Sequence, residues 1–460
     1  MNRPRTTFLS LLALVTAVAA QTPAKPVAAT ETPDLAGKVD AVVKRHLQKP
    51  TCVGLSVGVA HGGAVVAKGY GIADAEFDVK ADAETCFRIG SITKQFTAAL
   101  VMKLVEQGKL ALDDPLGKHV PDFPTGGKLV TVRQLLDHTS GIVSYTGLGP
   151  EWEKKQPLEL THDELLGLVA GKPFDFEPGT DWRYNNTGYY LLGVLLEKVT
   201  GRSYPQLIRD EIASPLGLGR TRYDSNRELI KNRAQGYEHV DGVLSNDAPL
   251  GMSQPGAAGA LLSTGGDLVR WSQALVEGKV VTPESYARMV QTTVLPNGRD
   301  THYGFGLGRD ELGGKVRIHH GGGINGFNSF LFWLPDAGFH VAVVSNSERL
   351  NARRVAEDIA YEVLGLQRPV AADKPTTAEL RALIAGDYTI ADLELPMRVF
   401  EKDGKPMAQA EGQEAFAILW QGEREFRAGF DPSVRLIWSQ DGKSFELHQS
   451  GGVFLARKKP

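Results

Sequence analysis

The distribution of apolar residues divides the chain into regions, and the first is a short apolar run at the N-terminus. Arg3 and Arg5 precede the run Phe8–Val18, which ends in small residues and is followed by polar Gln21. This layout is typical of a secretory signal peptide, and the run is shorter than the roughly 20 residues that span a bilayer. We therefore predict a signal peptide at 1–20, a protein that is periplasmic or secreted, and no stable membrane span after cleavage. An uncleaved N-terminal anchor is the alternative.

The next part of the chain predicts a helix, a hairpin and a second helix. Residues 21–34 are rich in Ala, Pro and Thr and predict a flexible lead-in. From Leu35 apolar residues recur at helical spacing, and the segments 53–60 and 64–70 have the pattern of two hairpin strands. The stretch 91–106 has the clearest helical spacing in the chain.

The pattern becomes irregular in the middle of the chain and returns to strands later. Residues 110–300 predict mostly short helices and loops, with strand patterns again at 316–320, 327–334 and 339–345 and a helix from about 351 to 364. The early and late parts are therefore expected to share one antiparallel sheet, flanked by helices, into which a mostly α region is inserted.

These elements predict an α+β fold of the α/β-sandwich type with a second, smaller domain. The main domain is placed at 35–366, and the proline-containing segment 367–378 is interpreted as a linker. Short alternating segments with hairpin signals at Asp403-Gly404 and Asp441-Gly442 follow. Residues 379–460 are therefore expected to form a small all-β barrel domain.

Composition narrows the class of protein. With 460 residues, 42% hydrophobic and 23% charged, the chain has ordinary globular usage and enough material for two or three domains. Lys plus Arg number 51 against 54 Asp plus Glu, a formal net charge of −3, and no basic block occurs, so we expect no nucleic-acid partner. The two cysteines, Cys52 and Cys86, allow one disulfide or two buried free thiols.

Candidate chemistry begins at Ser91-Ile92-Thr93-Lys94, at the start of the clearest helix. Three residues are about one helical turn, so the Ser91 hydroxyl and the Lys94 amine lie on one face and can approach each other. An amine kept neutral by burial can take the serine proton, and the helix N-terminus directs N–H groups toward a developing oxyanion. By itself the pattern is equally met by a capping serine and a solvated lysine.

Two other segments carry residues that fit a catalytic cleft. Tyr184-Asn185-Asn186 places a phenol and an amide two residues apart just before an apolar helix. His319-His320-Gly321-Gly322-Gly323 combines a polar strand end with glycines that let a ligand approach the backbone closely.

Taken together, these motifs resemble one family. Phe87–Lys94, Leu135–Gly141, Tyr184–Asn186 and His320–Gly322 follow in the order seen in the serine β-lactamase and penicillin-binding-protein superfamily. The branch that the chain resembles contains class C β-lactamases, D-alanyl-D-alanine carboxypeptidases and related esterases. The resemblance covers roughly 35–365, and the last 80 or so residues resemble the small β-barrel domain that many such hydrolases carry.

The resemblance implies a role for each matching residue. Ser91 would be the acylated nucleophile, Lys94 would take its proton, and Tyr184 would share the base role and pass the proton to the leaving group. Asn186 would hold Lys94 and bind the substrate amide. The backbone N–H groups of Ser91 and Gly323 would form the oxyanion hole.

The third motif departs from the family pattern. The β-lactamases and carboxypeptidases usually have Lys followed by Thr or Ser there, whereas this chain has His320 and Gly321, followed by Gly322, as the expected substrate-binding residues. A neutral histidine and a missing hydroxyl weaken recognition of a carboxylate. The predicted function is an exported serine hydrolase acting on a β-lactam, a D-amino-acid peptide or an ester, with a small-molecule or peptide substrate as its partner and the oligomeric state left open.

Other interpretations are weaker. Gly54–Gly58 matches the nucleophile-elbow pattern, but the strand there runs on into a hairpin, and Gly321–Gly326 lacks the βαβ frame of a dinucleotide site. No closely spaced ligand cluster suggests a metal, so we expect no cofactor, and His138 is interpreted as a buried structural residue. The alternative function is a penicillin-binding receptor or sensor of the same fold that is acylated slowly or not at all.

Overall fold

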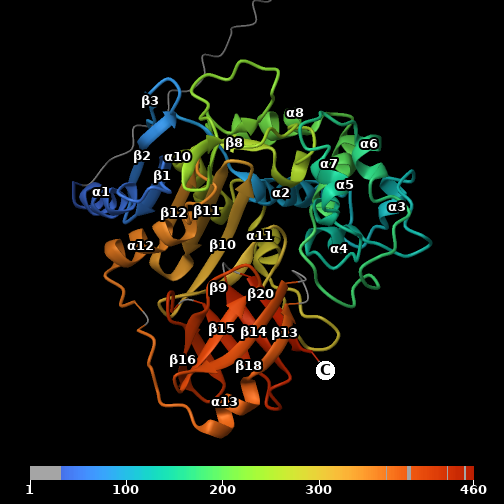
Figure 1. Ribbon diagram of the computed structural model, residues 1–460. Coiled ribbons are helices and arrows are strands. Elements are labelled where there is room, and N and C mark those ends of the chain that lie inside the picture. The colour runs from blue at the N-terminus through green and yellow to red at the C-terminus, as the bar shows by residue number, and fades with distance from the viewer. Residues whose placement is uncertain (1–32, 369, 391–394, 433, 450–451, 460) are drawn as a thin grey trace, which may run out of the picture.

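The computed structural model describes residues 33–368, 370–390, 395–432, 434–449 and 452–459 (Figure 1). The predicted signal peptide and most of the predicted lead-in lie outside the described residues. The chain forms a large domain, built on a sheet that helices flank, and a smaller barrel, shown in red, that lies beside one end of that sheet. This architecture confirms the predicted α+β fold class.

The large domain is organised around a seven-stranded antiparallel sheet with the order β3-β2-β1-β12-β11-β10-β9. The strands β1 and β2 form the predicted hairpin, and β12 joins them to the strands from the end of the domain. The bounds are β1 Gly54–His61, β2 Ala64–Asp74, β3 Val79–Lys80, β9 Gly308–Leu312, β10 Lys315–Ile324, β11 Phe327–Leu334 and β12 Phe339–Ser345.

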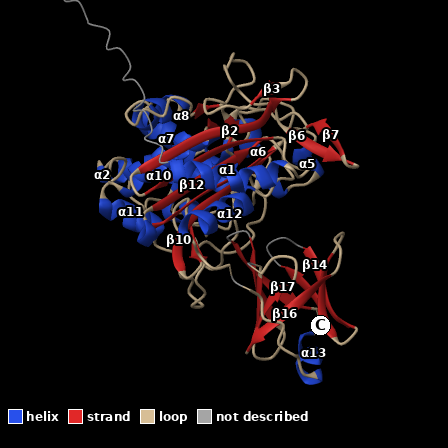
Figure 2. Ribbon diagram, turned by 90° about the vertical axis from the view of Figure 1, so that its left-hand side faces the viewer, coloured by secondary structure: helices blue, strands red, loops and turns tan. Residues whose placement is uncertain are grey.

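Alternate residues of the central strands point to two separate cores. Val341 and Val343 of β12 pack with α1 (Pro33–Leu47) and α12 (Ala352–Leu364) on one face of the sheet. Ala342 and Val344 pack on the other face, against α10 (Gly265–Val276) and α2 (Thr93–Glu106). Both faces are therefore covered, as the two views show (Figures 1 and 2), which explains why β12 is buried along its whole length.

The helix α1 begins at Pro33, so the last two residues of the predicted lead-in belong to its first turn. Proline suits the first turn of a helix because its missing N–H has no partner there in any case. The helix α12 follows the sequence prediction closely, since the Asn351 side chain accepts the N–H of Arg354 and caps it.

The inserted region is rich in short helices, as the sequence predicts, and lies to one side of the sheet (Figure 1). It also contains a hairpin, β6-β7, and two strands that join β4, which precedes α2, in a small sheet of order β4-β8-β5; the sequence analysis did not anticipate these strands. The bounds are α3 Leu116–His119, α4 Val132–Leu136, α5 Pro150–Glu153, α6 His162–Gly167, α7 Asn186–Thr200, α8 Tyr204–Ile208, α9 Gly256–Gly259, α11 Pro283–Val290, β4 Phe87–Arg88, β5 Arg222–Tyr223, β6 Tyr237–Val240, β7 Val243–Asn246 and β8 Leu261–Ser263.

The C-terminal domain is a closed eight-stranded barrel. It also has a helix, α13 (Ala378–Ile384), which the prediction of an all-β domain missed. Thr377 caps this helix by accepting the N–H of Leu380. The strands are β13 Gly386–Ile390, β14 Leu395–Lys402, β15 Lys405–Ala410, β16 Phe416–Gly422, β17 Glu425–Ala428, β18 Arg435–Trp438, β19 Ser444–Gln449 and β20 Gly452–Lys458.

The two cysteines are free thiols, which settles the choice that the sequence left open. Cys86 is buried and Cys52 half-buried, and burial raises the pKa of each thiol to about 11. Within the described part of the chain, none of the helices has the length and apolar character needed to cross a membrane.

Candidate active site

Ser91 lies on a tight turn that approaches the strand β10 unusually closely. It is in the 3-10 helix η1 (Gly90–Ile92), which continues into α2, and its side chain is partly exposed. A Cβ on Gly322 of β10 would lie 2.0 Å from the carbonyl oxygen of Ile89, so only glycine permits this contact. A Cβ on Gly90, whose φ is +50°, would lie 3.0 Å from the backbone nitrogen of Gly323. The turn that carries Ser91 therefore packs directly against the glycine-rich end of β10.

Lys94 is fully buried beneath Ser91 and makes three polar contacts. Its Nζ lies 3.0 Å from Oγ of Ser91, 2.8 Å from Oδ1 of Asn186 and 2.9 Å from the carbonyl oxygen of Ala258. Burial lowers the pKa of Lys94 well below its usual value. A neutral amine can donate its two protons to Oδ1 of Asn186 and the carbonyl oxygen of Ala258. Its lone pair is then left to accept a hydrogen bond from the serine hydroxyl. The contacts are thus those of an amine that can accept the Ser91 proton.

Tyr184 lies over Lys94 in the loop before α7. The lysine Nζ is 4.8 Å from the centre of the tyrosine ring. The Tyr184 hydroxyl is buried and makes no hydrogen bond within the described residues, although the Ser91 hydroxyl is near enough to lower the pKa of Tyr184 slightly. Burial outweighs that effect and raises the pKa, so the phenol is protonated at neutral pH. A buried hydroxyl without a partner is costly and is typical of functional sites.

Asn186 is the first residue of α7, and its amide is held from both ends. Its Oδ1 accepts from Lys94, its Nδ2 donates to Oγ1 of Thr146 at 3.0 Å, and its backbone N–H donates to Oγ of Ser144 at 3.1 Å. The neighbouring Asn185 has a different role, since its side chain caps α7 by accepting the N–H of Gly188.

The sequence analysis did not predict the contacts of Ser144 and Thr146 with Asn186, because hydroxyl residues in a loop carry no distinctive pattern.

His320 projects from β10, and both of its ring nitrogens are engaged by the protein. Nε2 lies 2.8 Å from the hydroxyl of Tyr303, and Nδ1 lies 2.6 Å from the carbonyl oxygen of Gly321. Burial, reinforced by the nearby Lys94, lowers the pKa of His320 to about 3. The ring is therefore neutral, with Nδ1–H donating to Gly321 and Nε2 accepting from Tyr303. Tyr303 was not anticipated from the sequence.

His138 lies behind these residues in a cluster of aromatic rings. Its ring centre is 4.4 Å from that of Tyr184 and 4.8 Å from that of Tyr303. Nδ1 accepts the backbone N–H of Asn185 at 3.1 Å. Burial lowers the pKa of His138 well below its usual value, so the ring is neutral. Its Nε2 is buried and has no hydrogen-bond partner within the described residues, so the interpretation of His138 as a structural residue stays a prediction.

The two rejected motifs lie where they cannot act as the sequence patterns suggest. Ser56, at the centre of the nucleophile-elbow pattern, is buried inside β1 and accepts the N–H of Gly265 at 2.9 Å. Gly321–Gly326 runs from the end of β10 into the turn before β11, with no helix following it.

The structure thus gathers residues from four separate parts of the sequence: the start of α2, the loop before α7, the end of β10 and the loop that carries Tyr303. A serine beside a buried amine and a phenol is suited to forming and hydrolysing an acyl-enzyme. Fold and site together define a serine hydrolase of the β-lactamase and penicillin-binding-protein class. The Beta-lactamase family matches residues 39–365, and the chain belongs to that family.

Known relatives extend this similarity. Penicillin-binding protein 4* of Bacillus subtilis is 30% identical over 292 residues, which make up 60% of this chain and 62% of that protein. The octameric penicillin-binding protein homologue from Pyrococcus abyssi has a TM-score of 0.67 at 26% identity and covers 92% of this chain and 100% of its own. A D-stereospecific amidohydrolase from Streptomyces sp. has a TM-score of 0.62 at 29% identity and covers 73% of this chain and 100% of its own.

Proposed function

We propose that this protein hydrolyses an ester or amide bond through an acyl-enzyme on Ser91, with simple esters and D-amino-acid amides as its preferred substrate class. The observation that carries this proposal is the contact set of Lys94, which leaves the amine lone pair for the Ser91 hydroxyl. The similarity to a D-stereospecific amidohydrolase supports the choice of substrate class.

Acylation follows from the positions of these groups. The Ser91 oxygen attacks the substrate carbonyl carbon while its proton passes to Nζ of Lys94. The carbonyl oxygen becomes an oxyanion, which the N–H groups of Ser91 and Gly323 stabilise. When the tetrahedral intermediate collapses, the bond to the leaving group breaks. The protonated Tyr184 hydroxyl gives its proton to that group and takes one from Lys94, which restores both residues to their starting forms.

Deacylation uses the same groups in reverse order. A water molecule attacks the acyl carbon, Lys94 takes a proton from the water with Tyr184 as relay, and the Ser91 oxygen leaves and is reprotonated. The products are a carboxylic acid and the free enzyme. Asn186 keeps the Lys94 amine oriented through both half-reactions, and its own orientation is fixed by Thr146.

The third motif sets the preference against carboxylate-bearing substrates. Because Tyr303 and the carbonyl of Gly321 occupy both nitrogens of His320, the ring has no free N–H for a substrate carboxylate. Its pKa of about 3 also removes the positive charge that a lysine would supply at neutral pH. Penicillins and peptides ending in D-alanine carry such a carboxylate, so we expect them to be poorer substrates than esters and amides.

A side-by-side hydrolysis assay tests the proposal. It compares p-nitrophenyl butyrate, D-phenylalaninamide, nitrocefin and a D-alanyl-D-alanine peptide, with Ser91→Ala as the control that removes the nucleophile. We expect Ser91-dependent cleavage of the ester or the D-amide with kcat/KM above that for nitrocefin. If Ser91→Ala retained the wild-type rate, the acyl-enzyme mechanism would be wrong, and if nitrocefin were the best substrate, the preference would be wrong.

We also propose that residues 1–20 direct export and are removed. The arginines ahead of a short apolar run and the small residues at its end support this proposal. Expression of the full chain in a Gram-negative host, followed by mass determination of the periplasmic form, tests it. A mature N-terminus near Gln21 is expected, whereas a full-length chain that stays in the cytoplasm would contradict the proposal.

A further inference from the structure

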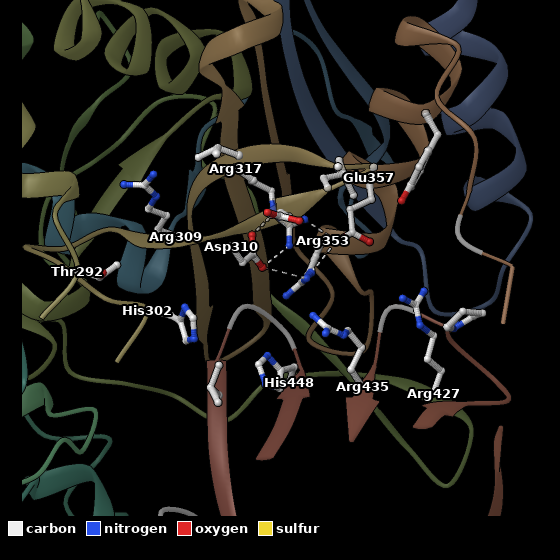
Figure 3. Close-up of a pocket in the computed structure, with 18 of the residues that line it drawn as sticks. Thr292, His302, Arg309, Asp310, Arg317, Arg353, Glu357, Arg427, Arg435 and His448 are labelled. Carbon is white, nitrogen blue, oxygen red and sulfur yellow. Dashed lines mark hydrogen bonds and ion pairs between the residues drawn. The ribbon is translucent and has the colours of Figure 1, made fainter. Parts of the chain in front are cut away.

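A cavity of about 960 Å³ lies between the large domain and the barrel, apart from the catalytic residues (Figure 3). Its walls come from β9, β10 and α12 on one side and from the barrel strands on the other. Arg317 of β10 lines it, three residues before His320, and contacts Glu357 of α12. Successive residues of a strand point to opposite faces, so Arg317 and His320 lie on opposite faces of the sheet. None of Ser91, Lys94, Tyr184 and His320 is among the lining residues, so the cavity is distinct from the catalytic site.

The lining is rich in cationic side chains. Five arginines line it against four carboxylates, and two histidines, His302 and His448, also line it with ring centres 6.0 Å apart. The arginines are Arg309, Arg317, Arg353, Arg427 and Arg435, and the carboxylates are Asp300, Asp310, Glu311 and Glu357. A volume of this size accommodates a ligand of metabolite or drug dimensions.

The guanidinium groups of the two domains face one another. Figure 3 shows Arg353 of α12 pointing down from the large domain and Arg427 and Arg435 pointing up from the barrel. Arg427 and Arg435 share a single carboxylate, Glu425, at 3.1 and 3.0 Å. Two arginines on one carboxylate leave a positive charge on the barrel side.

On the side of the large domain, Arg353 also has unused hydrogen-bonding capacity. Its Nε donates to Glu357 at 2.7 Å, but its Nη1 is buried and has no hydrogen-bond partner within the described residues. Arg317 already binds both Asp310 and Glu357, so these carboxylates are shared between two guanidinium groups. A buried guanidinium nitrogen without an acceptor costs free energy that an anionic ligand would recover.

Direct protein contacts between the two walls are sparse around the cavity. The described residues show one ion pair across the gap, between Arg354 of α12 and Asp431 of the barrel at 3.5 Å. Like charges that face each other across such a gap repel unless an anion lies between them. Planar guanidinium groups bind carboxylate and phosphate oxygens with two parallel hydrogen bonds.

We propose that this inter-domain cavity binds a small polyanion with two or more phosphate or carboxylate groups, held by Arg353 from the large domain and by Arg427 and Arg435 from the barrel. The ligand bridges the two domains and stabilises their relative position. This site is separate from the Ser91 chemistry, so its test does not depend on the proposed hydrolase activity.

Isothermal titration calorimetry of the full mature protein with inorganic pyrophosphate, tripolyphosphate and citrate, at constant ionic strength, tests the proposal. Wild type is expected to bind one or more of these probes with one molecule per chain, and binding should raise the midpoint of thermal unfolding. Binding of the phosphates alone identifies a phosphate ligand, and binding of citrate alone a carboxylate ligand.

Variants locate the binding. Arg427→Gln/Arg435→Gln is expected to weaken binding about tenfold or more, since each lost charge-assisted hydrogen bond is worth roughly a factor of ten. Arg398→Gln/Arg424→Gln removes the same charge from exposed barrel positions outside the cavity and should bind as wild type does. Arg353→Gln tests in the same way the arginine that lines the cavity on the side of the large domain. Absence of binding by all three probes, or equal binding by wild type and the Arg427→Gln/Arg435→Gln variant, would overturn the proposal.

Discussion

The hydroxyl group of Tyr303 lies 2.8 Å from Nε2 of His320, and this hydrogen bond changes what the third motif can do. With Nδ1 bonded to the carbonyl of Gly321, the imidazole is closed to a substrate on both nitrogens. The position that carries a cation in many relatives therefore carries a neutral ring that the protein itself satisfies. Tyr303 thus determines the state of the His320 ring, although no sequence motif contains it.

Restoring the usual residues of this motif should shift substrate preference. In His320→Lys/Gly321→Thr, the ammonium and hydroxyl can bind a substrate carboxylate. A Cβ on Gly321 would lie 3.4 Å from the ring of Phe330 and 3.8 Å from the carbonyl oxygen of Ser329, which are ordinary contacts, so the threonine fits at that atom. We expect the ratio of kcat/KM for nitrocefin to kcat/KM for p-nitrophenyl butyrate to rise about 10- to 100-fold, the value of one or two charge-assisted hydrogen bonds.

A control isolates the contribution of charge in that experiment. His320→Gln keeps a polar, uncharged side chain and should leave the ratio within about threefold of wild type. If His320→Gln raised the ratio as much as the lysine variant, loss of the Tyr303 contact rather than the new cation would be responsible, and the carboxylate argument would fail.

Removal of the Tyr184 hydroxyl should separate activity from stability. The hydroxyl is buried and makes no hydrogen bond within the described residues, so Tyr184→Phe discards a polar atom that the fold does not satisfy. We expect kcat to fall about 10²- to 10⁴-fold, the usual contribution of a proton-transfer group, while the midpoint of thermal unfolding stays equal or rises. The paired measurements are steady-state kinetics and a thermal melt. A large drop in the unfolding midpoint would show instead that the hydroxyl is a structural contact.

The pH dependence of activity should report the protonation state of Lys94. Activity requires the neutral amine, so kcat/KM falls as the pH drops below the pKa of Lys94, which burial has lowered. Asn186→Asp replaces the acceptor 2.8 Å from Nζ with a carboxylate, which favours the ammonium form and raises the pKa of Lys94. We therefore expect the acid limb of the pH–rate profile to move to higher pH. Movement to lower pH, or an unchanged limb, would contradict the role of Lys94 as base.

A control variant that changes no charge accompanies Asn186→Asp. Thr146→Val removes the hydroxyl that holds the far end of the Asn186 amide without adding charge. It should lower kcat modestly, by about tenfold or less, and leave the acid limb in place. A shift in both variants would indicate that orientation of the amide, not charge, controls the Lys94 pKa.

The sequence predicted the hairpin, the helix that begins after Ser91 and the returning strands, because each has a periodic apolar pattern and a recognisable stop signal. It missed the hairpin β6–β7, where Val243 and Leu244 are exposed and apolar alternation therefore carries no burial signal. It also missed α13, a seven-residue helix that is too short to show helical periodicity.

The residues of the candidate site also fall into those that the sequence predicted and those that it missed. Ser91, Lys94, Tyr184 and His320 could be found because their motifs are local in sequence. The carbonyl of Ala258, which contacts Lys94, and the hydroxyl of Tyr303, which contacts His320, could not. Each meets its partner across a sequence separation that only the tertiary fold closes. Every residue has a backbone carbonyl, so the sequence does not mark the one that contacts Lys94. A tyrosine in a loop can equally be a core residue, so its type does not predict a contact with His320.

Breaking the buried ion-pair network beside the inter-domain cavity should strongly destabilise the fold, because it leaves a buried charge without its partner. Arg317 is buried, binds Asp310 through two nitrogens at 2.6 and 2.5 Å, and binds Glu357 at 2.6 Å. In Arg317→Met, Arg353 is the one arginine that the described residues still show paired with these two carboxylates. Removing one partner of a buried network costs about 3–5 kcal/mol, so the free energy of unfolding should fall by that amount at pH 7. Arg209→Met, which removes an exposed pair with Asp210, is the matched control and should lower the free energy of unfolding far less, because solvent screens the exposed pair.

The same network gives a prediction with a definite sign in pH. Arg317 helps to hold the pKa of Asp310 well below its usual value against the opposing effect of burial. A carboxyl group with a lowered pKa stabilises the fold above its unfolded pKa of about 4, and this contribution is lost as the pH falls toward the folded value. In Arg317→Met the lowering is largely removed, so protonation of Asp310 relieves part of the cost. Urea denaturation at pH 7 and pH 3.5 should therefore show a smaller difference between wild type and variant at the lower pH, and a wider one there would refute this account of the network.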